Sequence, residues 1–349
     1  MTANALERTP MGSSTELAPT TTIKARAAMR TGFYAGAMAA AAKLAKIYGD
    51  NEHEYGKNAL KDAYDLHVKV LSRPGMREVM KKAEREDLAT LPFFLAQAPF
   101  DVARVIGRAR SNTKKGAVTP RDSFPYPDYY LNDFHHQVNG NLSTRAALTY
   151  EWQIRILFMG CSRLMRQSVI DALPEGDHLD VLDVACGTAS WITQARLQNR
   201  RHHVTGIDLS PNYLKVAKMF RGKHATFEQM NAEYLAPEWK DRFDVVTCIW
   251  LFHELPPEAS ARCAAEMARV LKAGGRLLFM DAAQPADVPN EGQGVVAGIS
   301  ERFRDTMNEP FFRMYQGIDL DRLFRDNGLV IEKTERTYTS RVMVMKKSA

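Results

Sequence analysis

Two acidic residues stand at the ends of short apolar runs in the middle of the chain. Asp183 ends the run Val-Leu-Asp, and Asp208 ends the run Gly-Ile-Asp 25 residues later. A turn of small residues, Ala-Cys-Gly-Thr-Ala at 185–189, follows the first run. If both runs are parallel strands, both carboxylates lie at the edge where such sheets bind ligands, and small side chains let a ligand approach. A carboxylate at position 208 can accept both hydroxyls of a ribose, so the pair predicts a nucleoside-containing cofactor.

The glycine content of this turn separates two kinds of nucleoside cofactor. A dinucleotide site needs Gly-x-Gly-x-x-Gly so that a pyrophosphate can rest on a helix N-terminus, and here only Gly187 is present. S-adenosylmethionine has no phosphate, and its sulfonium and ammonium charges favour a nearby carboxylate such as Asp183. The turn therefore favours S-adenosylmethionine over a dinucleotide.

The segment WLFHEL at 250–255 offers acid–base chemistry. The imidazole of His253, with a pKa near 6.5 when unperturbed, suits removal of a hydroxyl proton at neutral pH, and Glu254 would orient it. The alternative is that His253 only shapes the loop after a strand. No zinc motif is present, because His-Glu-x-x-His would need a second His where Pro257 stands. We predict no metal site.

A scaffold must bring these residues together. Residues 143–173 show one long helical pattern with Ser143 as its N-cap, and short Val-, Ile-, Leu- and Phe-rich runs then alternate with helical patterns. Such alternation predicts an α/β fold with a mostly parallel, doubly wound sheet. The chain closes with a helical pattern at 319–327 and two β-rich runs, LVIEKTERT and SRVMVMKK.

The stretch 143–349 resembles the class I, Rossmann-like S-adenosylmethionine-dependent methyltransferases. The motifs in family order are the turn at 183–189, Asp208, Asn231-Ala232-Glu233, FDVVTCIWLFHELPP at 243–257 and ARVLKAGGRLLFMD at 268–281. Ala185 and Ala189 stand where the first family motif has glycines. The resemblance implies a seven-stranded sheet with an antiparallel last strand, S-adenosylmethionine as cofactor and S-adenosylhomocysteine as product.

The resemblance also implies roles for single residues. The turn would cradle the methionine part, Asp208 would bind the ribose, Leu209 would pack on adenine, and the Asn231 side-chain oxygen would accept from the adenine amino group. The implied cofactor contacts are Asp183, Ala185, Cys186, Gly187, Asp208, Leu209, Asn231, Ala232, Cys248 and Ile249.

The position of His253 resembles that of the general base in the W-x-x-H-[DE] segment of plant and actinobacterial small-molecule O-methyltransferases. This likeness favours O-methylation of a small-molecule acceptor, with His253 and Glu254 as the catalytic pair. A similar His-Glu-Leu-Pro run occurs in relatives of quinone C-methyltransferases, where it need not act as a base. S-, N- and C-methylation by proximity and alignment therefore stay open, as does a protein that binds the cofactor and transfers nothing.

Two polar-aromatic segments are candidates for the acceptor side of the site. The segment 126–143 is rich in Tyr and His for a linker, and the segment 281–316 follows the fifth strand, where this fold commonly borders the acceptor. The alternative for both is plain packing between the two parts of the chain. The candidate lid and substrate residues are Tyr129, Tyr130, His135, His136, Trp250, Glu309, Phe312 and Tyr315.

The rest of the chain predicts a helical attachment. We expect a disordered tail at 1–22, a helical domain and linker at 23–130, and the methyltransferase domain at 131–349. Residues 1–130 hold 20 Lys and Arg against 14 Asp and Glu, so the whole net charge of +6 lies there. These charges are dispersed, and the fourth strand lacks the [DN]-P-P-[YF] sequence of nucleic-acid amino-methylases, which argues against a nucleic-acid partner.

Composition sets the remaining expectations. An apolar share of 45% and a charged share of 25% are those of a globular protein. Four widely spaced cysteines suggest neither disulfides nor zinc, so we expect a cytoplasmic protein. The uncharged stretch 31–42 is too short to span a bilayer, and the N-terminal helices are candidates for a homodimer contact.

Overall fold

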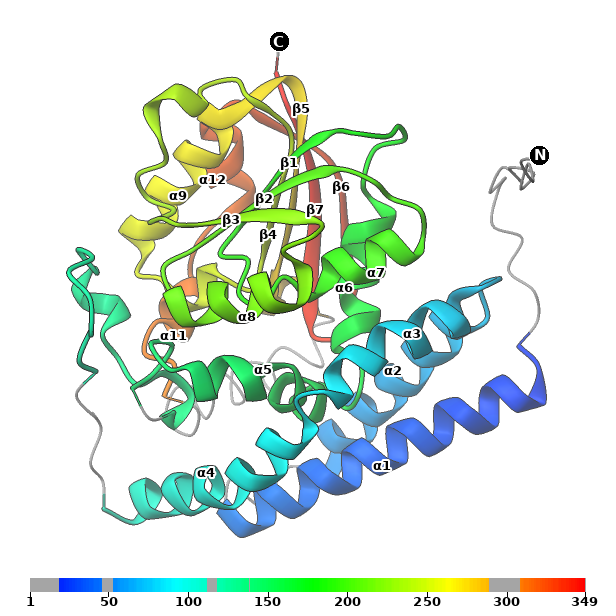
Figure 1. Ribbon diagram of the computed structural model, residues 1–349. Coiled ribbons are helices and arrows are strands. Elements are labelled where there is room, and N and C mark those ends of the chain that lie inside the picture. Colours follow the sequence, from blue (N-terminus) through cyan, green and yellow to red (C-terminus); the bar gives the residue numbers. More distant parts are fainter. Residues whose placement is uncertain (1–18, 46–52, 112–117, 138, 289–307, 349) are drawn as a thin grey trace, which may run out of the picture.

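A seven-stranded sheet forms the centre of the computed structural model, which describes residues 19–45, 53–111, 118–137, 139–288 and 308–348 (Figure 1). The strand order is β3-β2-β1-β4-β5-β7-β6. Strands β1 to β5 are parallel, and β7 is antiparallel to both of its neighbours. The strands are β1 Asp180–Val184, β2 His203–Asp208, β3 Ala225–Gln229, β4 Phe243–Ile249, β5 Leu271–Ala282, β6 Leu329–Thr337 and β7 Ser340–Lys347. The predicted α/β fold with an antiparallel last strand is confirmed.

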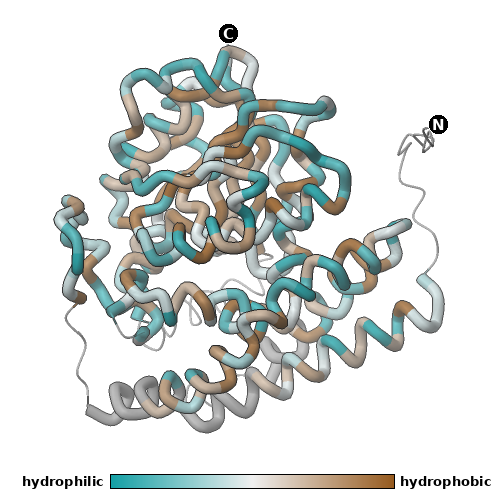
Figure 2. Tube along the Cα trace, in the orientation of Figure 1, coloured by the Kyte–Doolittle hydropathy of each residue, from teal (hydrophilic) through white to brown (hydrophobic). Residues whose placement is uncertain are grey.

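Both faces of the sheet are buried, as the apolar runs indicate. In β1, Leu182 and Val184 pack with α9 and α12, whereas Val181 packs with α6, α7 and α8. Side chains of a strand alternate between faces, so each strand contributes to two cores. The hydrophobic colour in Figure 2 concentrates accordingly in the strands. The helices are α6 Ser162–Asp171, α7 Ser190–Leu197, α8 Pro211–Arg221, α9 Pro257–Val270, α11 Phe312–Gln316 and α12 Leu320–Asp326.

Four N-terminal helices form a layer next to α5 (Thr144–Leu157), which lies between this layer and the sheet (Figure 1). They are α1 Thr21–Ala45, α2 His53–Leu71, α3 Met76–Leu88 and α4 Leu91–Ser111. The predicted tail is too long by two residues, because α1 begins at Thr21. Residues 1–18 of that tail and residues 112–117 of the predicted linker lie outside the described residues.

The predicted long helix over 143–173 is divided in two. Ser143 caps α5 as predicted and accepts a hydrogen bond from the Ala146 amide at 3.3 Å. Helix α5 then ends before Met159 and Gly160, which both have positive φ, 48° and 80°. A Cβ on Gly160 would lie 2.6 Å from the ring of Tyr34 in α1. The chain therefore breaks the helix where the N-terminal layer comes closest.

None of the described helices is long and apolar enough to cross a membrane.

Candidate functional site

A pocket opens at the carboxyl ends of the parallel strands, and the empty space in it measures about 1040 Å³ when the solvent at its open mouth is included. The ends of β1, β2 and β4 form one side of it. Helices α5 and α6 and the short turns η1 (Asp128–Tyr130) and η2 (Phe134–His136) form the other. Nine of the ten predicted cofactor residues line this pocket: Asp183, Ala185, Cys186, Gly187, Asp208, Leu209, Asn231, Ala232 and Ile249.

Cys248 is the predicted cofactor residue whose side chain does not reach the pocket. It is fully buried in the core that packs against α9. Alternation along β4 turns Thr247 and Ile249 to the opposite face of the sheet. The prediction for Cys248 is therefore wrong, because the strand end was judged without its register.

The turn after β1 has an unusual backbone. Ala185, Gly187 and Ala189 have φ values of 53°, 53° and 55°. The left-handed region costs a residue with a Cβ roughly 1–2 kcal/mol. The two alanines that replace family glycines thus keep the conformation that a glycine would adopt freely, and the turn retains its shape at an energetic cost.

Asp183 is held at the bottom of the pocket by two uncharged donors. Its Oδ2 accepts from the Trp191 indole at 2.8 Å, and its Oδ1 accepts from the Thr247 hydroxyl at 2.7 Å. The residue is 2% exposed. Burial raises the pKa of Asp183 to about 6, against these two hydrogen bonds. A cation in the pocket would lower this pKa again.

Asp208 joins the first two strand ends. Its Oδ2 accepts from the Gly187 amide at 2.9 Å, and its Oδ1 accepts from the Ser210 amide at 2.8 Å. Burial raises the pKa of Asp208 to about 6 as well. Each carboxylate oxygen can accept more than one hydrogen bond, so both remain able to receive a hydroxyl.

Asn231 follows β3 in a tight turn with Glu233. The Asn231 Oδ1 accepts from the Glu233 amide at 2.9 Å, and a second lone pair of this oxygen is available to a ligand. Tyr129 of η1 lines the pocket and donates its hydroxyl to Glu233 at 2.6 Å. The predicted lid segment is thus tied to the strand end that carries Asn231. Tyr130, its neighbour, also lines the pocket.

Acids and imidazoles alternate beside the pocket. The Nδ1 of His253 lies 2.6 Å from Asp281 Oδ1, and the Nε2 of His135 lies 3.0 Å from Glu309 Oε1. The same His135 nitrogen lies 3.7 Å from Glu254 Oε1. Of these five residues, only Glu254 lines the pocket. Segments that are distant in the sequence therefore meet in one cluster.

Asp281, and not Glu254, holds the imidazole of His253, so the predicted orienting role of Glu254 is wrong. Asp281 is fully buried at the end of β5 and also accepts from the Phe252 amide at 2.6 Å and the Ala282 amide at 2.7 Å. A carboxylate fixed by two amides presents one oxygen to the ring. In the sequence, Asp281 can be recognised as the acidic residue that ends the apolar run LLFMD, as Asp183 and Asp208 end theirs.

The cluster carries shifted pKa values. Burial opposes the charge of His253, but the attraction of Asp281 and the hydrogen bond to it outweigh burial and raise the pKa to about 10. For His135, burial is likewise outweighed by Glu309, and the pKa is raised. Burial raises the pKa of Glu254. His253 is consequently protonated at neutral pH in the absence of a ligand.

Of the other predicted acceptor residues, Trp250 lines the pocket, whereas Phe312 and Tyr315 pack against His253. Trp250 lines the pocket and donates its indole N–H to Ser340 at 3.0 Å. Phe312 presents its edge to His253, with ring centroids 5.8 Å apart. Tyr315 is fully buried, and its hydroxyl donates to the Ala282 carbonyl at 2.6 Å, so it packs beneath the cluster and is not open to a substrate. The side chain of His136 lies outside the described residues.

Several pocket residues have no motif in the sequence, among them Arg166 and Tyr150. Arg166 of α6 lies 2.9 Å from Glu151 of α5, and its guanidinium lies 4.9 Å from the Trp250 ring centroid. Tyr150 of α5 lines the pocket beside it. Both residues occupy polar positions inside a long helical pattern. Such positions predict helix packing or solvent exposure and do not indicate a ligand site. Among the described residues, no group of three or more His, Cys, Asp or Glu could hold a metal ion.

The strand order, the antiparallel last strand and the carboxylate-lined pocket define a class I, Rossmann-like methyltransferase domain, the class of S-adenosylmethionine-dependent enzymes. Residues 181–275 match the family described as a methyltransferase domain. This part of the chain is thus a methyltransferase domain of this class, whose cofactor is S-adenosylmethionine.

Relatives with assigned names match the same part of the chain. A demethylmenaquinone methyltransferase of Lactiplantibacillus plantarum is 31% identical over 44% of this chain and 66% of its own length. A ubiquinone biosynthesis O-methyltransferase of Nitrosomonas europaea is 35% identical over 33% of this chain and 49% of its own length. The matches thus span less than two thirds of each relative. A SAM-dependent methyltransferase structure from Methanosarcina mazei is 19% identical, covers 52% of this chain and 97% of its own, and has a TM-score of 0.40.

Proposed function

We propose that the protein transfers the methyl group of S-adenosylmethionine to a small-molecule acceptor, with a hydroxyl oxygen as the favoured acceptor atom. The observation that carries this proposal is the pair Asp183 and Asp208 at the edge of one pocket. A buried and a partly buried carboxylate, both with only uncharged donors, suit a ligand that brings cationic groups and hydroxyls. They do not suit a pyrophosphate, because like charges would meet.

The residues present fit the cofactor. Asp208 would accept from the ribose hydroxyls, Asn231 from the adenine amino group, and Leu209 and Ala232 would pack against the base. Asp183 would face the methionine end together with the turn at 185–187. When bound, S-adenosylmethionine supplies an activated methyl group on a sulfonium. Helices α5 and α6 and turn η1 contribute to the wall opposite the strand ends and would limit the access of water to a bound cofactor.

His253 is the favoured general base. Its Nδ1 is fixed by Asp281, which leaves Nε2 to receive a hydroxyl proton once the ring is neutral. The pKa of about 10 means that this neutral form is scarce at pH 7 and grows as the pH rises. Glu254 and His135 adjoin the pocket side of the cluster and would pass or hold the proton.

The names of the relatives support an aromatic acceptor that carries a hydroxyl, such as a quinol. A second candidate is C-methylation, because the Lactiplantibacillus relative is named a demethylmenaquinone methyltransferase. In that case Asp281 and His253 would serve alignment only. S- and N-methylation remain alternatives, whereas a nucleic-acid acceptor and a non-catalytic role are less favoured.

The experiment is S-adenosylhomocysteine release with a panel of phenols, quinols, thiols and amines, in the wild type, in His253→Ala and in His203→Ala. His203 begins β2 and is exposed, so its variant is the matched control. General-base catalysis is worth about 100-fold or more, so His253→Ala should lose that factor on a hydroxyl acceptor. Cofactor binding without product from any acceptor would refute the transfer. Unimpaired turnover of His253→Ala would refute the base.

We also propose a homodimer through the N-terminal layer and a place in the cytoplasm, where the four free thiols would stay reduced. Met29 and Phe33 of α1 are 66% and 71% exposed, and Phe93, Leu95 and Phe100 of α4 are 55%, 61% and 65% exposed. Apolar surface of this kind is typical of an interface. Light scattering on the wild type should give twice the chain mass, and Phe93→Asp should give the monomer; a monomeric wild type would refute the dimer.

A further inference from the structure

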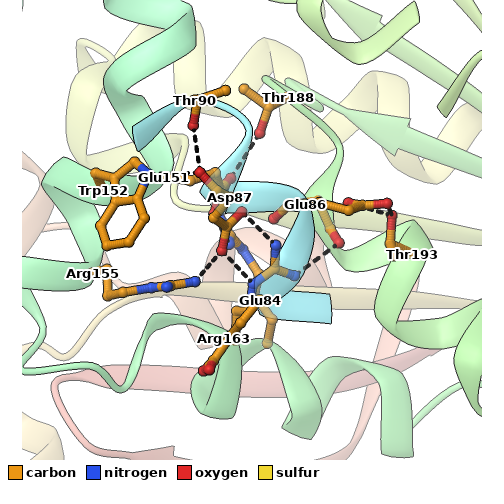
Figure 3. Close-up of polar contacts among 12 residues, drawn as sticks. Glu84, Glu86, Asp87, Thr90, Glu151, Trp152, Arg155, Arg163, Thr188 and Thr193 are labelled. Carbon is orange, nitrogen blue, oxygen red and sulfur yellow. Dashed lines mark hydrogen bonds and ion pairs between the residues drawn. The ribbon is translucent and has the colours of Figure 1, made fainter. Parts of the chain in front are cut away.

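The acidic end of α3 enters the interior of the molecule (Figure 3). Asp87 is 3% exposed and accepts hydrogen bonds from Arg155 and from Arg163, the latter at 2.8 and 3.1 Å. Its main-chain carbonyl accepts from the Trp152 indole at 2.8 Å. These partners belong to α5 and α6, so the N-terminal layer is anchored to the helices that cover the pocket.

Glu86 makes a second contact, toward the sheet. Its Oε2 lies 2.6 Å from Arg221, the last residue of α8, and the Thr193 hydroxyl lies 2.9 Å from both carboxylate oxygens. Arg221 is 2% exposed, and its Nη1 donates to the main-chain carbonyl of Thr188 at 2.9 Å. Thr188 belongs to the turn after β1. One buried arginine therefore connects α3 to that turn.

The same turn is held at two more points. Arg163 reaches the Ser190 carbonyl at 3.4 Å, and the Thr188 hydroxyl donates to Glu151 at 2.7 Å. Glu151 in turn pairs with the pocket residue Arg166. Gly187, Ser190 and their neighbours line the pocket from the inner side, so these contacts grip the turn from outside.

The backbone of the turn explains why an external grip is needed. Left-handed residues with a Cβ persist only where the surrounding structure over-determines them, and Ala185 and Ala189 are two such residues. In the ion pair of Glu86 with Arg221 the arginine side chain is buried and the Glu86 side chain is 26% exposed, so desolvation of the arginine offsets much of the attraction and the pair is a weak source of stability. A pair such as Glu86 and Arg221, aimed at a strained turn, is better explained by fixing geometry than by adding stability.

We infer that α3 positions the cofactor turn, and that Glu86 is a positioning residue that acts on the Thr188 carbonyl through Arg221. This inference rests on the proposed function of the pocket. The Glu86 carboxylate binds Nη2 of Arg221, so that Nη1 of the same guanidinium points at the Thr188 carbonyl. Without it, a buried cation loses its partner and the guanidinium loses its direction. The predicted boundary at residue 130 therefore separates a helix from the site that it shapes.

The test is the affinity for S-adenosylhomocysteine, measured by calorimetry on the full chain well below the unfolding temperature. Glu86→Gln should weaken binding about tenfold, since changes along such a network alter coupling by that order. Glu78→Gln, an exposed carboxylate on the same helix, is the matched control and should leave the affinity unchanged. Thermal unfolding of each variant is recorded in parallel.

Two further variants separate positioning from general stability. Arg221→Lys keeps the charge but loses the forked geometry, and Glu86→Gln added to it should weaken binding little further if Glu86 acts through Arg221. Thr193→Val removes the hydroxyl that donates to Glu86 and accepts from Arg221 Nε at 3.3 Å, but it keeps both charges; it should weaken binding two- to threefold and replaces Glu86→Gln if the latter does not fold.

The outcomes are distinct. A lower unfolding temperature with an affinity within twofold of the wild type means that α3 is structural only and overturns the inference. If the losses of binding free energy caused by Glu86→Gln and Arg221→Lys are fully additive, Glu86 does not act through Arg221, and that part of the inference is overturned. Failure of the wild type to bind S-adenosylhomocysteine refutes the proposed function, and the positioning role falls with it; binding by the wild type with unchanged binding by Glu86→Gln refutes positioning alone.

Discussion

The proposed site has two halves that are built in opposite ways: the pocket residues proposed to bind the cofactor (the cofactor half) and the cluster of acids and imidazoles beside the pocket (the acceptor half). The cofactor half takes its residues from the ends of β1, β2, β3 and β4, which are neighbours in the sheet, and these residues lie within 183–249. The acceptor half joins His135 and Glu309, which are 174 residues apart, to the ends of β4 and β5. Sheet order brings the residues of the first half together, whereas the second half depends on how loops pack. The scaffold can thus keep one cofactor while loops change the acceptor.

The two halves also differ in the partners of their carboxylates. Asp183 and Asp208 receive only uncharged donors, so their partners of opposite charge or their hydroxyl donors must come from a ligand. In the acceptor half, Asp281 and Glu309 already have imidazoles as partners. The cofactor half is therefore prepared to bind, and the acceptor half is prepared to hold or release a proton.

The largest effect is expected in the cofactor half. Asp208→Ala removes an acceptor for two ribose hydroxyls, and hydrogen bonds to a charged group are worth about 1.5–3 kcal/mol each. The dissociation constant of S-adenosylmethionine should rise at least about 100-fold, measured by calorimetry. Asp208→Asn, which keeps one acceptor oxygen, should lose less. An unchanged constant for Asp208→Ala would remove the ribose contact.

The same comparison explains what the sequence could predict. Strand ends are visible as apolar runs, so Asp183, Asp208 and Asn231 could be placed at one edge, and nine of ten cofactor residues line the pocket. Cys248 failed because its direction depends on strand register. The partner of His253 also failed, because Glu254 is adjacent in sequence whereas Asp281 is adjacent only across β4 and β5.

The burial of charged residues within helices could not be predicted from the sequence either. Arg166, Glu151 and Asp87 lie in helical patterns, where a charged residue is usually assigned to solvent, but all three are buried. Their burial follows from a third layer of helices, which periodicity cannot reveal. The break at Gly160 belongs to the same class, since the close approach of Tyr34 is a tertiary contact.

A second prediction tests the acceptor half. Asp281→Asn puts an amide beside His253, which favours the tautomer with its proton on Nε2, so that Nε2 is free to act as the base in only a small share of the molecules. Turnover of a hydroxyl acceptor should fall about 100-fold at saturating cofactor. Binding of S-adenosylhomocysteine should stay within a fewfold of the wild type, because Asp281 does not line the pocket. Loss of cofactor affinity instead would mean that the two halves are not separable.

The pH dependence sharpens this prediction. The pKa of His253 in the folded protein is about 10, above the ordinary 6.5. Its contribution to stability is therefore fully present below pH 6.5 and is lost as the pH rises through 10. Turnover by a neutral base should rise over the same range. Asp281→Asn should move the rising limb to lower pH; an unmoved limb would assign the profile to another group.

The smallest effect is expected in the turn of the cofactor half. Ala185→Gly relieves a left-handed alanine but adds freedom to the unfolded chain, so the free energy of unfolding should rise by no more than about 1 kcal/mol. Ala185→Val is the control and should destabilise the protein by more than that, because a branched side chain tolerates this φ poorly. Denaturant unfolding measures both. Because α3 and Arg221 fix the turn from outside, Ala185→Gly should leave the affinity for S-adenosylhomocysteine unchanged. A weaker affinity would mean that the stiffness of the alanine itself, and not the external grip, keeps the turn in its binding shape.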